Sequence, residues 1–368
     1  MNGENNMNAK RFTARAPGKL FVAGEYAVTE PNQDSIVVAV DRYLSVDIQR
    51  AHTNRLDLLD LQLTDVSWNV KENEVIFSEQ DERLNFVKSV METFIDYVNE
   101  YEPTHIVVTS ELDSESGKKY GLGSSAALSV ALLTALFKFS DHSQNDIDQL
   151  TIFKLASIAH FQAQGNGSCA DIAASTYGGW LNYRSFDAEW LVNQLEEGRP
   201  VKELVEDEWP SLKIVPLKSP DYLEFIVGWT QETAQTGPMV AKVHQLKAEQ
   251  PDVYQFILNS SQKAVEQMIK GFTESDSELV FCGMSENRDV LRKLGAEAAV
   301  SIETPILTKL IDAVANDGAA KSSGAGGGDC GVAFVKDKDV ALRVYQLWSE
   351  AGIEPLDINV SPVGVEIN

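Results

Sequence analysis

The stretch from Lys118 to Leu128 combines glycine, serine and lysine in a pattern suited to binding an anion. Gly121 and Gly123 permit positive φ angles and a close approach of the backbone to another group. Ser124 or Ser125 is expected to cap the helix predicted after them, whose first N–H groups then have no partner within the helix. Those N–H groups and the helix dipole favour phosphate oxygens. Taken alone, the pattern is equally typical of an ordinary helix start.

Three other segments carry glycine beside a side chain that can do chemistry. The first is Pro17-Gly18-Lys19, a corner with a lysine directly after it. The second runs from Gly165 to Asp171 and ends in a carboxylate, and the third, Gly318 to Gly331, is the most glycine-dense part of the chain. Lys19 by itself is compatible with a solvent-exposed turn. Together, the glycine segments predict a site that holds phosphate groups.

The familiar phosphate and hydrolase motifs do not fit these segments. The P-loop pattern Gly-x-x-x-x-Gly-Lys-Ser/Thr and the protein-kinase motifs are absent from the sequence. In the dinucleotide pattern, a third glycine is required where this chain has Asp329. The nucleophile elbow Gly-x-Ser-x-Gly is also missing. Five histidines without a spaced pair argue against a zinc hydrolase.

Composition limits the class of protein and of partner. The 368 residues predict two domains of ordinary size, and 43% hydrophobic residues supply ample core. The net charge of −24 disfavours nucleic acid as a partner. No segment has the length of apolar sequence that a membrane span needs, and the first residues lack an apolar signal core. With three scattered cysteines, these features lead us to expect a cytoplasmic protein.

The spacing of apolar residues predicts alternating strands and helices in both halves. Residues 1–10 are expected to be a disordered tail, residues 11–210 one domain and residues 211–368 a second. Strands are expected over 11–16, 36–50, 56–70, 75–78, 104–112, 178–183, 212–217, 223–229, 332–335 and 356–360. Helices are expected over 83–101, 125–139, 146–164, 238–248, 253–271, 274–294, 303–316 and 337–351.

Three blocks, in this order and spacing, resemble the GHMP small-molecule kinases, which include galactokinase, homoserine kinase, mevalonate kinase and phosphomevalonate kinase. The blocks are Pro17-Gly18-Lys19 with Gly24-Glu25, then Gly121 to Ala127, then Ser323 to Asp329. Within that family, Ala163 to Ser168 and Lys321 to Gly331 are similar to the phosphomevalonate kinase branch. So is the stretch from Glu286 to Gly295 followed by Ile302-Glu303-Thr304-Pro305.

This resemblance implies an α+β fold of two domains. The N-terminal domain would be of the ribosomal protein S5 domain 2 type and the C-terminal domain ferredoxin-like, with the substrates between them. The implied reaction is phosphoryl transfer from ATP to (R)-5-phosphomevalonate with Mg²⁺ as cofactor. The alternatives are another kinase of the family, such as mevalonate kinase or homoserine kinase, a related decarboxylase, or a non-catalytic small-molecule sensor.

The resemblance also assigns roles to residues. Lys19 and Asp171 would be catalytic, and Ser125 would place its hydroxyl on Mg²⁺. The ATP-binding residues would be Lys119, Gly121, Leu122, Gly123, Ser124, Ser125 and Ala126. The acceptor would contact Lys19, Lys119, Ser168, Gln235, Thr236, Arg288, Ser323 and Ala325.

For several residues, a purely structural role competes with a functional one. Arg288 is expected either to bind substrate phosphate or to pair with Glu286 or Asp289 nearby. Asp329 is expected to shape its glycine turn by backbone hydrogen bonds. His160 stands where mevalonate kinases carry a metal-binding glutamate, but Mg²⁺ prefers oxygen ligands, so we expect a packed histidine. The protein is expected to be a monomer or a homodimer.

Overall fold

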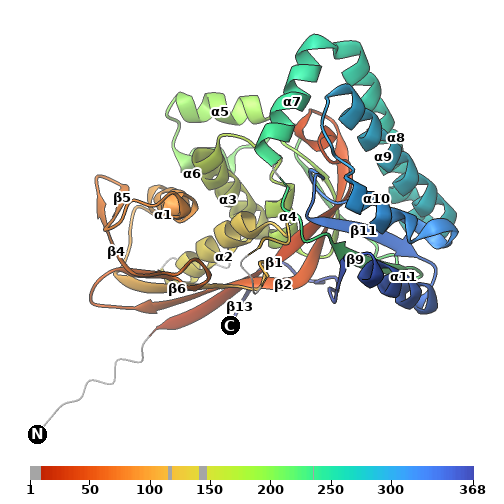
Figure 1. Ribbon diagram of the computed structural model, residues 1–368. Helices are drawn as coiled ribbons and strands as arrows, with labels where there is room; N and C mark the ends of the chain where they lie inside the picture. Colours follow the sequence, from red (N-terminus) through yellow and green to blue (C-terminus); the bar gives the residue numbers. More distant parts are fainter. Residues whose placement is uncertain (1–9, 115–117, 141–146, 235) are drawn as a thin grey trace, which may run out of the picture.

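The computed structural model describes residues 10–114, 118–140, 147–234 and 236–368. Within these ranges the strands form two sheets, one of nine strands and one of four. Figure 1 shows the sheets in two lobes that meet along the strands β1 and β2. None of the described helices is long and apolar enough to cross a membrane.

The first sheet has the order β13-β1-β2-β6-β3-β4-β5, and β7 pairs with both β2 and β8. Among the strand pairs of this sheet in the described part of the chain, only that of β3 with β6 is parallel. The strands β8 and β13 come from the second half of the chain, so this sheet crosses the predicted boundary near residue 210. Its strands are β1 (Arg11–Ala23), β2 (Asp34–Arg50), β3 (Arg55–Leu58), β4 (Leu63–Lys71), β5 (Glu74–Phe77), β6 (Thr104–Ser110), β7 (Trp180–Arg184), β8 (Lys213–Leu217) and β13 (Glu366–Ile367).

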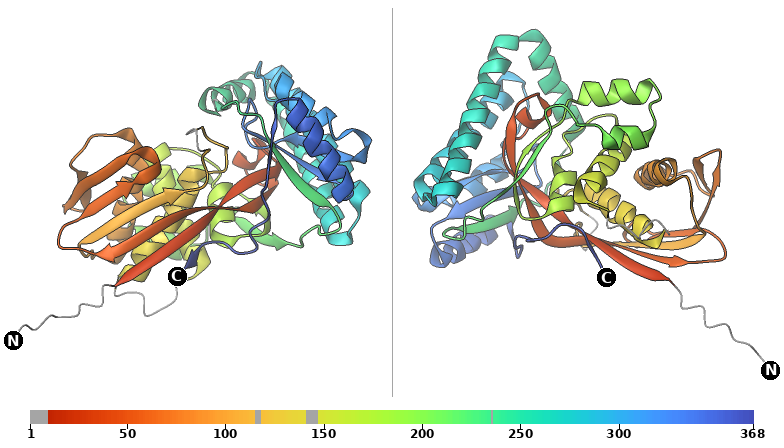
Figure 2. Two further views of the ribbon diagram at one scale, coloured as in Figure 1. Left: turned by 60° about the horizontal axis from the view of Figure 1, so that its bottom comes forward. Right: turned by 180° about the vertical axis from the view of Figure 1, so that it is seen from behind.

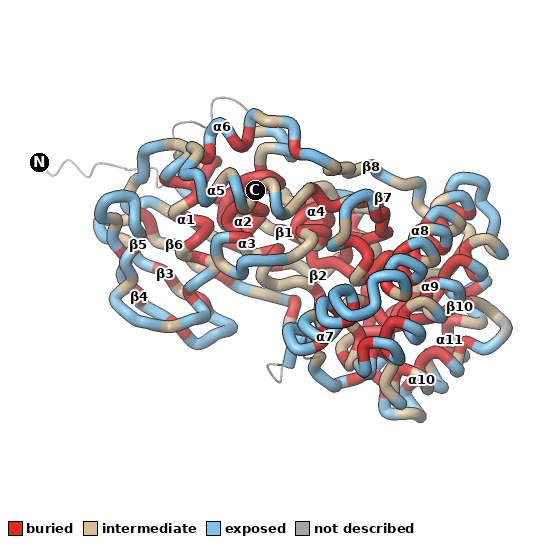
Figure 3. Tube along the Cα trace, turned by 90° about the horizontal axis from the view of Figure 1, so that it is seen from above, coloured by how far each residue is buried: buried red, intermediate tan, exposed pale blue. Residues whose placement is uncertain are grey.

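Helices cover one face of this sheet, and the opposite face is turned forward in the left view of Figure 2. Helix α2 is apolar on all sides, as a helix in the interior of a domain must be, and Figure 3 shows it buried along most of its length. The helices of this lobe are α1 (Asn85–Val98), α2 (Ser124–Phe139), α3 (Gln149–Gln164), α4 (Ala170–Tyr177), α5 (Ala188–Glu196) and α6 (Val201–Glu206).

The second sheet is antiparallel with the order β10-β11-β9-β12, the arrangement of a ferredoxin-like βαββαβ unit. Alternate residues of β11 face opposite sides, so Ala333 packs with α10 and α11 while Phe334 packs toward the first lobe. The elements are β9 (Glu224–Trp229), β10 (Gly318–Ser322), β11 (Cys330–Val335), β12 (Glu354–Leu356), α7 (Thr236–Glu249), α8 (Pro251–Glu274), α9 (Ser277–Glu297), α10 (Pro305–Asp312) and α11 (Lys338–Glu350).

Aromatic side chains join the two lobes. Trp180 of the first sheet lies 5.6 Å from Phe334 and 5.1 Å from Phe225 of the second, measured between ring centroids. Phe272 of α8 lies 5.3 Å from the same tryptophan. Each large ring removes apolar area from water, so the two lobes share one continuous core.

Most predicted elements are confirmed, with shifts of a few residues at their ends, but the bounds of two strands differ from those expected. The first strand was expected to stop at Pro17-Gly18, but β1 continues to Ala23 because a register shift at this point absorbs the proline. The start of the C-terminal glycine segment, expected as loop, forms strand β10 and pairs with β11.

Candidate active site

The predicted anion-binding turn is built around two glycines in left-handed conformations, Gly121 at φ +83° and Gly123 at φ +81°. Gly123 occupies the N-cap position of α2, and no side chain caps this helix. The expectation that Ser124 or Ser125 caps α2 was therefore wrong, because Ser124 is already the first helical residue. The first N–H groups of α2 therefore have no side-chain cap, which is the arrangement from which the sequence predicts anion binding.

Lys19 is held inside this turn. Its backbone N–H donates to the Leu122 carbonyl at 2.8 Å, and its Nζ donates to the Gly121 carbonyl at 3.1 Å. The side chain is buried, which excludes the alternative of a solvent-exposed turn residue. A Cβ atom on Gly123 would lie 3.2 Å from the lysine side chain, and the left-handed φ of +81° favours glycine at this position.

Asp171 reaches the same place from another helix. It lies in the first turn of α4, which begins after Cys169 in a left-handed conformation. A Cβ atom on Gly123 would be 3.5 Å from the Cβ of Asp171. The structure therefore brings together Lys19, Asp171 and the N-terminal turn of α2, which come from three separate parts of the sequence.

Asp329 closes the turn from the second lobe. Its side chain lies against Gly121, where a Cβ atom would approach the carboxylate to 2.8 Å. The carbonyl of Asp329 accepts hydrogen bonds from Thr230, and its Oδ1 accepts one from the Ala234 N–H at 3.2 Å. These bonds hold Asp329 against residues 230–234, whereas from the sequence it was expected to shape its own glycine turn. Burial raises the pKa of Asp329, against the opposing effects of the Ala234 bond and the charges of Lys19 and Lys119.

Lys119 is exposed and lies on the loop that leads into the turn. Its positive charge also acts on Asp113, with which it forms an isolated β-bridge. The neighbouring Lys118 is also exposed and donates to the Gln231 carbonyl at 3.4 Å. Both lysines thus lie at the solvent-exposed edge of the glycine turn, where their side chains can reach an anion bound at the turn.

Part of the predicted acceptor set lines a small cavity of about 140 Å³ beside Phe21, which includes Ser168, Thr236 and Ala325. The Ser168 carbonyl is fixed by the hydroxyls of Tyr183 at 2.5 Å and Ser185 at 3.2 Å. Gln235 lies outside the described residues. Residues from both lobes therefore line the cavity, Phe21 and Ser168 from the first and Thr236 and Ala325 from the second.

Two members of that set are already bound to other protein groups. The hydroxyl of Ser323 donates to the Phe21 carbonyl at 2.8 Å and accepts from the Phe21 N–H at 3.0 Å, which ties the two lobes together. Arg288 forms two hydrogen bonds with Glu303, at 2.8 and 2.7 Å, so it pairs with a carboxylate that neither alternative for it named. A substrate role for either residue stays a prediction.

A magnesium ion would be held by few protein atoms. Among the described residues, no group of three or more histidine, cysteine, aspartate or glutamate side chains is arranged for a metal. Ser125 and Asp171 both lie in helix N-terminal turns next to Gly123, and oxygens of this kind suit Mg²⁺ when phosphates and water complete the shell. His160 is buried beneath the Gly167 loop, as expected for a packed histidine.

A buried ion pair lies at the wall of the cavity, between two residues for which the sequence predicted no role. Glu25 follows β1, and one of its oxygens accepts from Nζ of Lys321 in β10, with both side chains fully buried. The adjacent Tyr26 donates its hydroxyl to the Ala325 carbonyl at 2.6 Å. The only signal in the sequence was the position of both charged residues within glycine-rich blocks.

Comparison with known proteins identifies the family. The GHMP kinases N terminal domain matches residues 85–179, and the GHMP kinases C terminal domain matches residues 268–354. A phosphomevalonate kinase of Streptomyces sp. (strain CL190) is 33% identical over 97% of this chain and 99% of its own length. This chain belongs to the GHMP kinase family.

A solved structure shows that the GHMP kinase fold extends over 95% of this chain. Protein Lin0012 of Listeria innocua has a TM-score of 0.91 at 37% identity and covers 97% of this chain, with 99% of its own chain matched. Phosphomevalonate kinase of Streptococcus pneumoniae, in complex with phosphomevalonate and AMPPNP, has a TM-score of 0.83 at 27% identity, with 95% and 99% covered. The two-domain α+β fold implied by the sequence is confirmed, and the chain is a kinase.

Proposed function

We propose that this GHMP kinase transfers the γ-phosphoryl group of ATP to (R)-5-phosphomevalonate, giving ADP and 5-diphosphomevalonate in the mevalonate pathway. The observation that carries the proposal is the meeting of Lys19, Asp171 and the uncapped turn of α2 at Gly123. Phosphoryl transfer is catalysed mainly by positioning and by neutralising charge on the transferred group. A buried lysine and a helix N-terminus supply that stabilisation.

The donor would lie on the glycine turn. The N–H groups of the first turn of α2 would face the β- and γ-phosphates, and Lys119 at the rim adds positive charge. Mg²⁺, held by Ser125 and Asp171 together with phosphate oxygens, would neutralise charge on the nucleotide. Lys19 would face the γ-phosphate as its charge shifts toward the leaving oxygen.

The acceptor would occupy the cavity of Ser168, Thr236 and Ala325, with Lys19 and Lys119 toward its phosphate. In a chain with a net charge of −24, these lysines are the local source of attraction for an anion. The relatives named phosphomevalonate kinase support this acceptor over others in the family.

The reaction needs no strong base. The second pKa of a phosphomonoester is about 6, so the acceptor is mostly dianionic at neutral pH and its oxygen attacks the γ-phosphorus directly. The bond from the γ-phosphorus to the β,γ-bridging oxygen breaks, and ADP leaves with that electron pair. Asp171 then orients Lys19 and the metal more than it removes a proton.

A coupled assay of ADP release, with a panel of acceptors, tests the proposal. Turnover is expected with phosphomevalonate and not with mevalonate, homoserine or diphosphomevalonate. Turnover with mevalonate or homoserine alone would assign another kinase of the family, and CO₂ release from diphosphomevalonate would assign the related decarboxylase. No ADP release with any acceptor would favour a sensor that binds without catalysis.

A further inference from the structure

Residues 229–234, which we name the connecting segment, run from the glycine turn to the cavity proposed for the acceptor. At the start of the segment, Trp229 packs edge-on against Tyr120 of the loop that enters the turn, with ring centroids 4.8 Å apart. At its end, Ala234 lies two positions before Thr236, which begins α7 and lines the cavity. The segment therefore contacts one site and leads directly into the other.

Asp329 joins this segment to the glycine turn. Its Oδ1 accepts a hydrogen bond from the Ala234 N–H at 3.2 Å. Its Oδ2 faces Gly121, where a Cβ atom would lie 2.8 Å from that oxygen. The backbone of Asp329 is fixed as well, because its N–H donates to the Glu232 carbonyl at 2.7 Å and its carbonyl accepts from the Thr230 N–H at 2.9 Å. One carboxylate thus contacts both the connecting segment and the turn.

Further contacts join the turn to the second lobe at the same place. The thiol of Cys330, next to Asp329, donates to the Tyr120 carbonyl at 3.1 Å. Nζ of Lys118 donates to the Gln231 carbonyl at 3.4 Å. A shift of the connecting segment would therefore reach the turn through protein atoms in direct contact.

The residue on which Asp329 packs also positions Lys19. The Gly121 carbonyl accepts a hydrogen bond from Nζ of Lys19 at 3.1 Å. This lysine is the one proposed to face the γ-phosphate, where a misplacement of about 1 Å can cost about a hundredfold in rate. The place of Lys19 thus depends on a carboxylate that the connecting segment holds.

We propose that Asp329 is a positioning residue that couples the binding of the two substrates. A ligand in the cavity fixes the connecting segment, and Asp329 then holds Gly121 and Lys19 where the nucleotide phosphates require them. The inference rests on the proposed function, which assigns ATP to the turn and phosphomevalonate to the cavity. Each substrate is expected to bind more tightly when the other is present, by the same factor in both directions.

The sign of this coupling is informative. ATP and phosphomevalonate are both anions, and like charges held close together repel each other. Their charges alone therefore predict that each weakens the binding of the other. The contacts of Asp329 predict the opposite, because the first ligand has already ordered the segment and the turn that the second ligand needs.

Calorimetry on the full chain measures the coupling. The Kd of phosphomevalonate is determined with and without a saturating nonhydrolysable ATP analogue and Mg²⁺, and the ratio of the two values is the coupling factor. In the wild type, the analogue is expected to tighten phosphomevalonate binding by about fivefold or more. A residue with a merely structural role would change stability or the individual Kd values and leave the ratio as it is.

Variants at Asp329 separate contact from charge. Asp329→Gly removes the carboxylate without backbone strain, because the left-handed φ of +52° suits glycine, and is expected to abolish the coupling. Asp329→Asn keeps the Oδ1 acceptor for Ala234 and should retain most of it. Asp329→Ser, too short to contact both Gly121 and Ala234, is a second variant expected to lose the coupling if the glycine variant does not fold.

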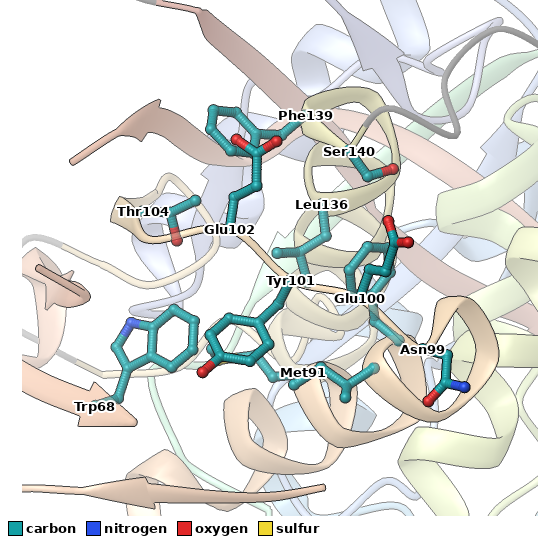
Figure 4. Close-up of a pocket in the computed structure, with 12 residues that line it drawn as sticks. Trp68, Met91, Asn99, Glu100, Tyr101, Glu102, Thr104, Leu136, Phe139 and Ser140 are labelled. Atoms are coloured by element: carbon teal, nitrogen blue, oxygen red, sulfur yellow. The ribbon is translucent and has the colours of Figure 1, made fainter. Parts of the chain in front are cut away.

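A matched control is available at the other end of α2. This helix starts in the turn, and its sixteen residues at 1.5 Å each place its last residues about 24 Å away, beside a separate pocket. Figure 4 shows that pocket with Phe139 of α2 and Asn99 of the lining. Asn99 has a left-handed φ of +62°, so Asn99→Gly repeats the change made at Asp329 far from both substrates and should keep the wild-type coupling factor.

The possible failures are distinguishable. Equal Kd values with and without the analogue in the wild type would overturn the coupling itself. A coupling factor that Asp329→Gly and Asp329→Ser leave unchanged would show that Asp329 does not carry it. A loss in Asp329→Asn as complete as in Asp329→Gly would assign the effect to charge and overturn the bridging role. Phosphomevalonate that does not bind the wild type in either condition would contradict the proposed function together with this inference.

Discussion

Lys321 and Glu25 form a buried ion pair that links the second sheet to the end of strand β1 in the first lobe. Burial lowers the pKa of Lys321, and the neighbouring Glu25 opposes that effect. Since Tyr26 and Ser323 next to this pair also bridge the lobes, the pair helps to fix the wall of the cavity lined by Ser168 and Ala325.

Replacing one partner of this pair should lower the free energy of unfolding far more than replacing both partners. Lys321→Met is expected to lower the free energy of unfolding by about 3–5 kcal/mol, because Glu25 then stays buried with an uncompensated charge. The double variant with Glu25→Gln should recover much of the loss, as measured by urea unfolding. Lys242→Met, at an exposed lysine bound to the Ala299 carbonyl, is the control. Equal effects of the two single lysine variants would contradict a special role for the buried pair.

Lys19 should matter more for turnover than Asp171. Lys19→Ala is expected to lower kcat by about a thousandfold or more, because a charge that stabilises the transferred phosphoryl group is lost. Asp171→Asn should keep measurable turnover with phosphomevalonate, because a dianionic acceptor needs no general base. Initial rates of ADP release compare the two. An Asp171→Asn enzyme as inactive as Lys19→Ala would reverse this ranking.

Gly121 should be irreplaceable for a reason beyond its backbone conformation. Gly121→Ala places a Cβ atom 2.8 Å from the Asp329 carboxylate and is expected to raise the KM for ATP at least tenfold by distorting the turn. Gly165→Ala is a matched control, because its φ is also left-handed but a Cβ atom there meets nothing within 4 Å. It should cost only about 1–2 kcal/mol of stability. Similar KM changes in both variants would mean that backbone strain alone is responsible.

The Arg288–Glu303 pair should make stability sensitive to acid. Burial raises the pKa of Glu303, but the hydrogen bonds and charge of Arg288, with Thr308, outweigh it and hold that pKa below the usual 4.5. The carboxylate therefore contributes stability that is complete above pH 4.5 and is lost as pH falls through the lowered value. Thermal unfolding between pH 3 and 6 should show this loss in the wild type and a smaller one in Glu303→Gln. Identical pH profiles would show that the pair contributes nothing.

The sequence predicted the elements better than their long-range partners. Periodic apolar residues indicated α1 and α8 because these helices bury one face, a property of local spacing. The edge strand β13 consists of two residues paired with β1, too short to leave a pattern. Lys321 and Glu25 are 296 positions apart, and no local rule joins residues so distant.

In the candidate site, too, local features were predictable from the sequence and long-range partners were not. The glycine turn was predictable because positive φ angles need glycine, and Gly121 and Gly123 have them. Glu303 could not be predicted as the partner of Arg288, because it lies beyond the end of α9 and only the fold brings the two side chains together.

The most direct test of the proposed function is the chemical identity of the product. Phosphorus NMR of a reaction with ATP and phosphomevalonate should show the acceptor's monoester resonance replaced by the two coupled resonances of a diphosphate, one equivalent for each ADP formed. ADP that accumulates while the phosphomevalonate signal stays unchanged would contradict transfer to this acceptor.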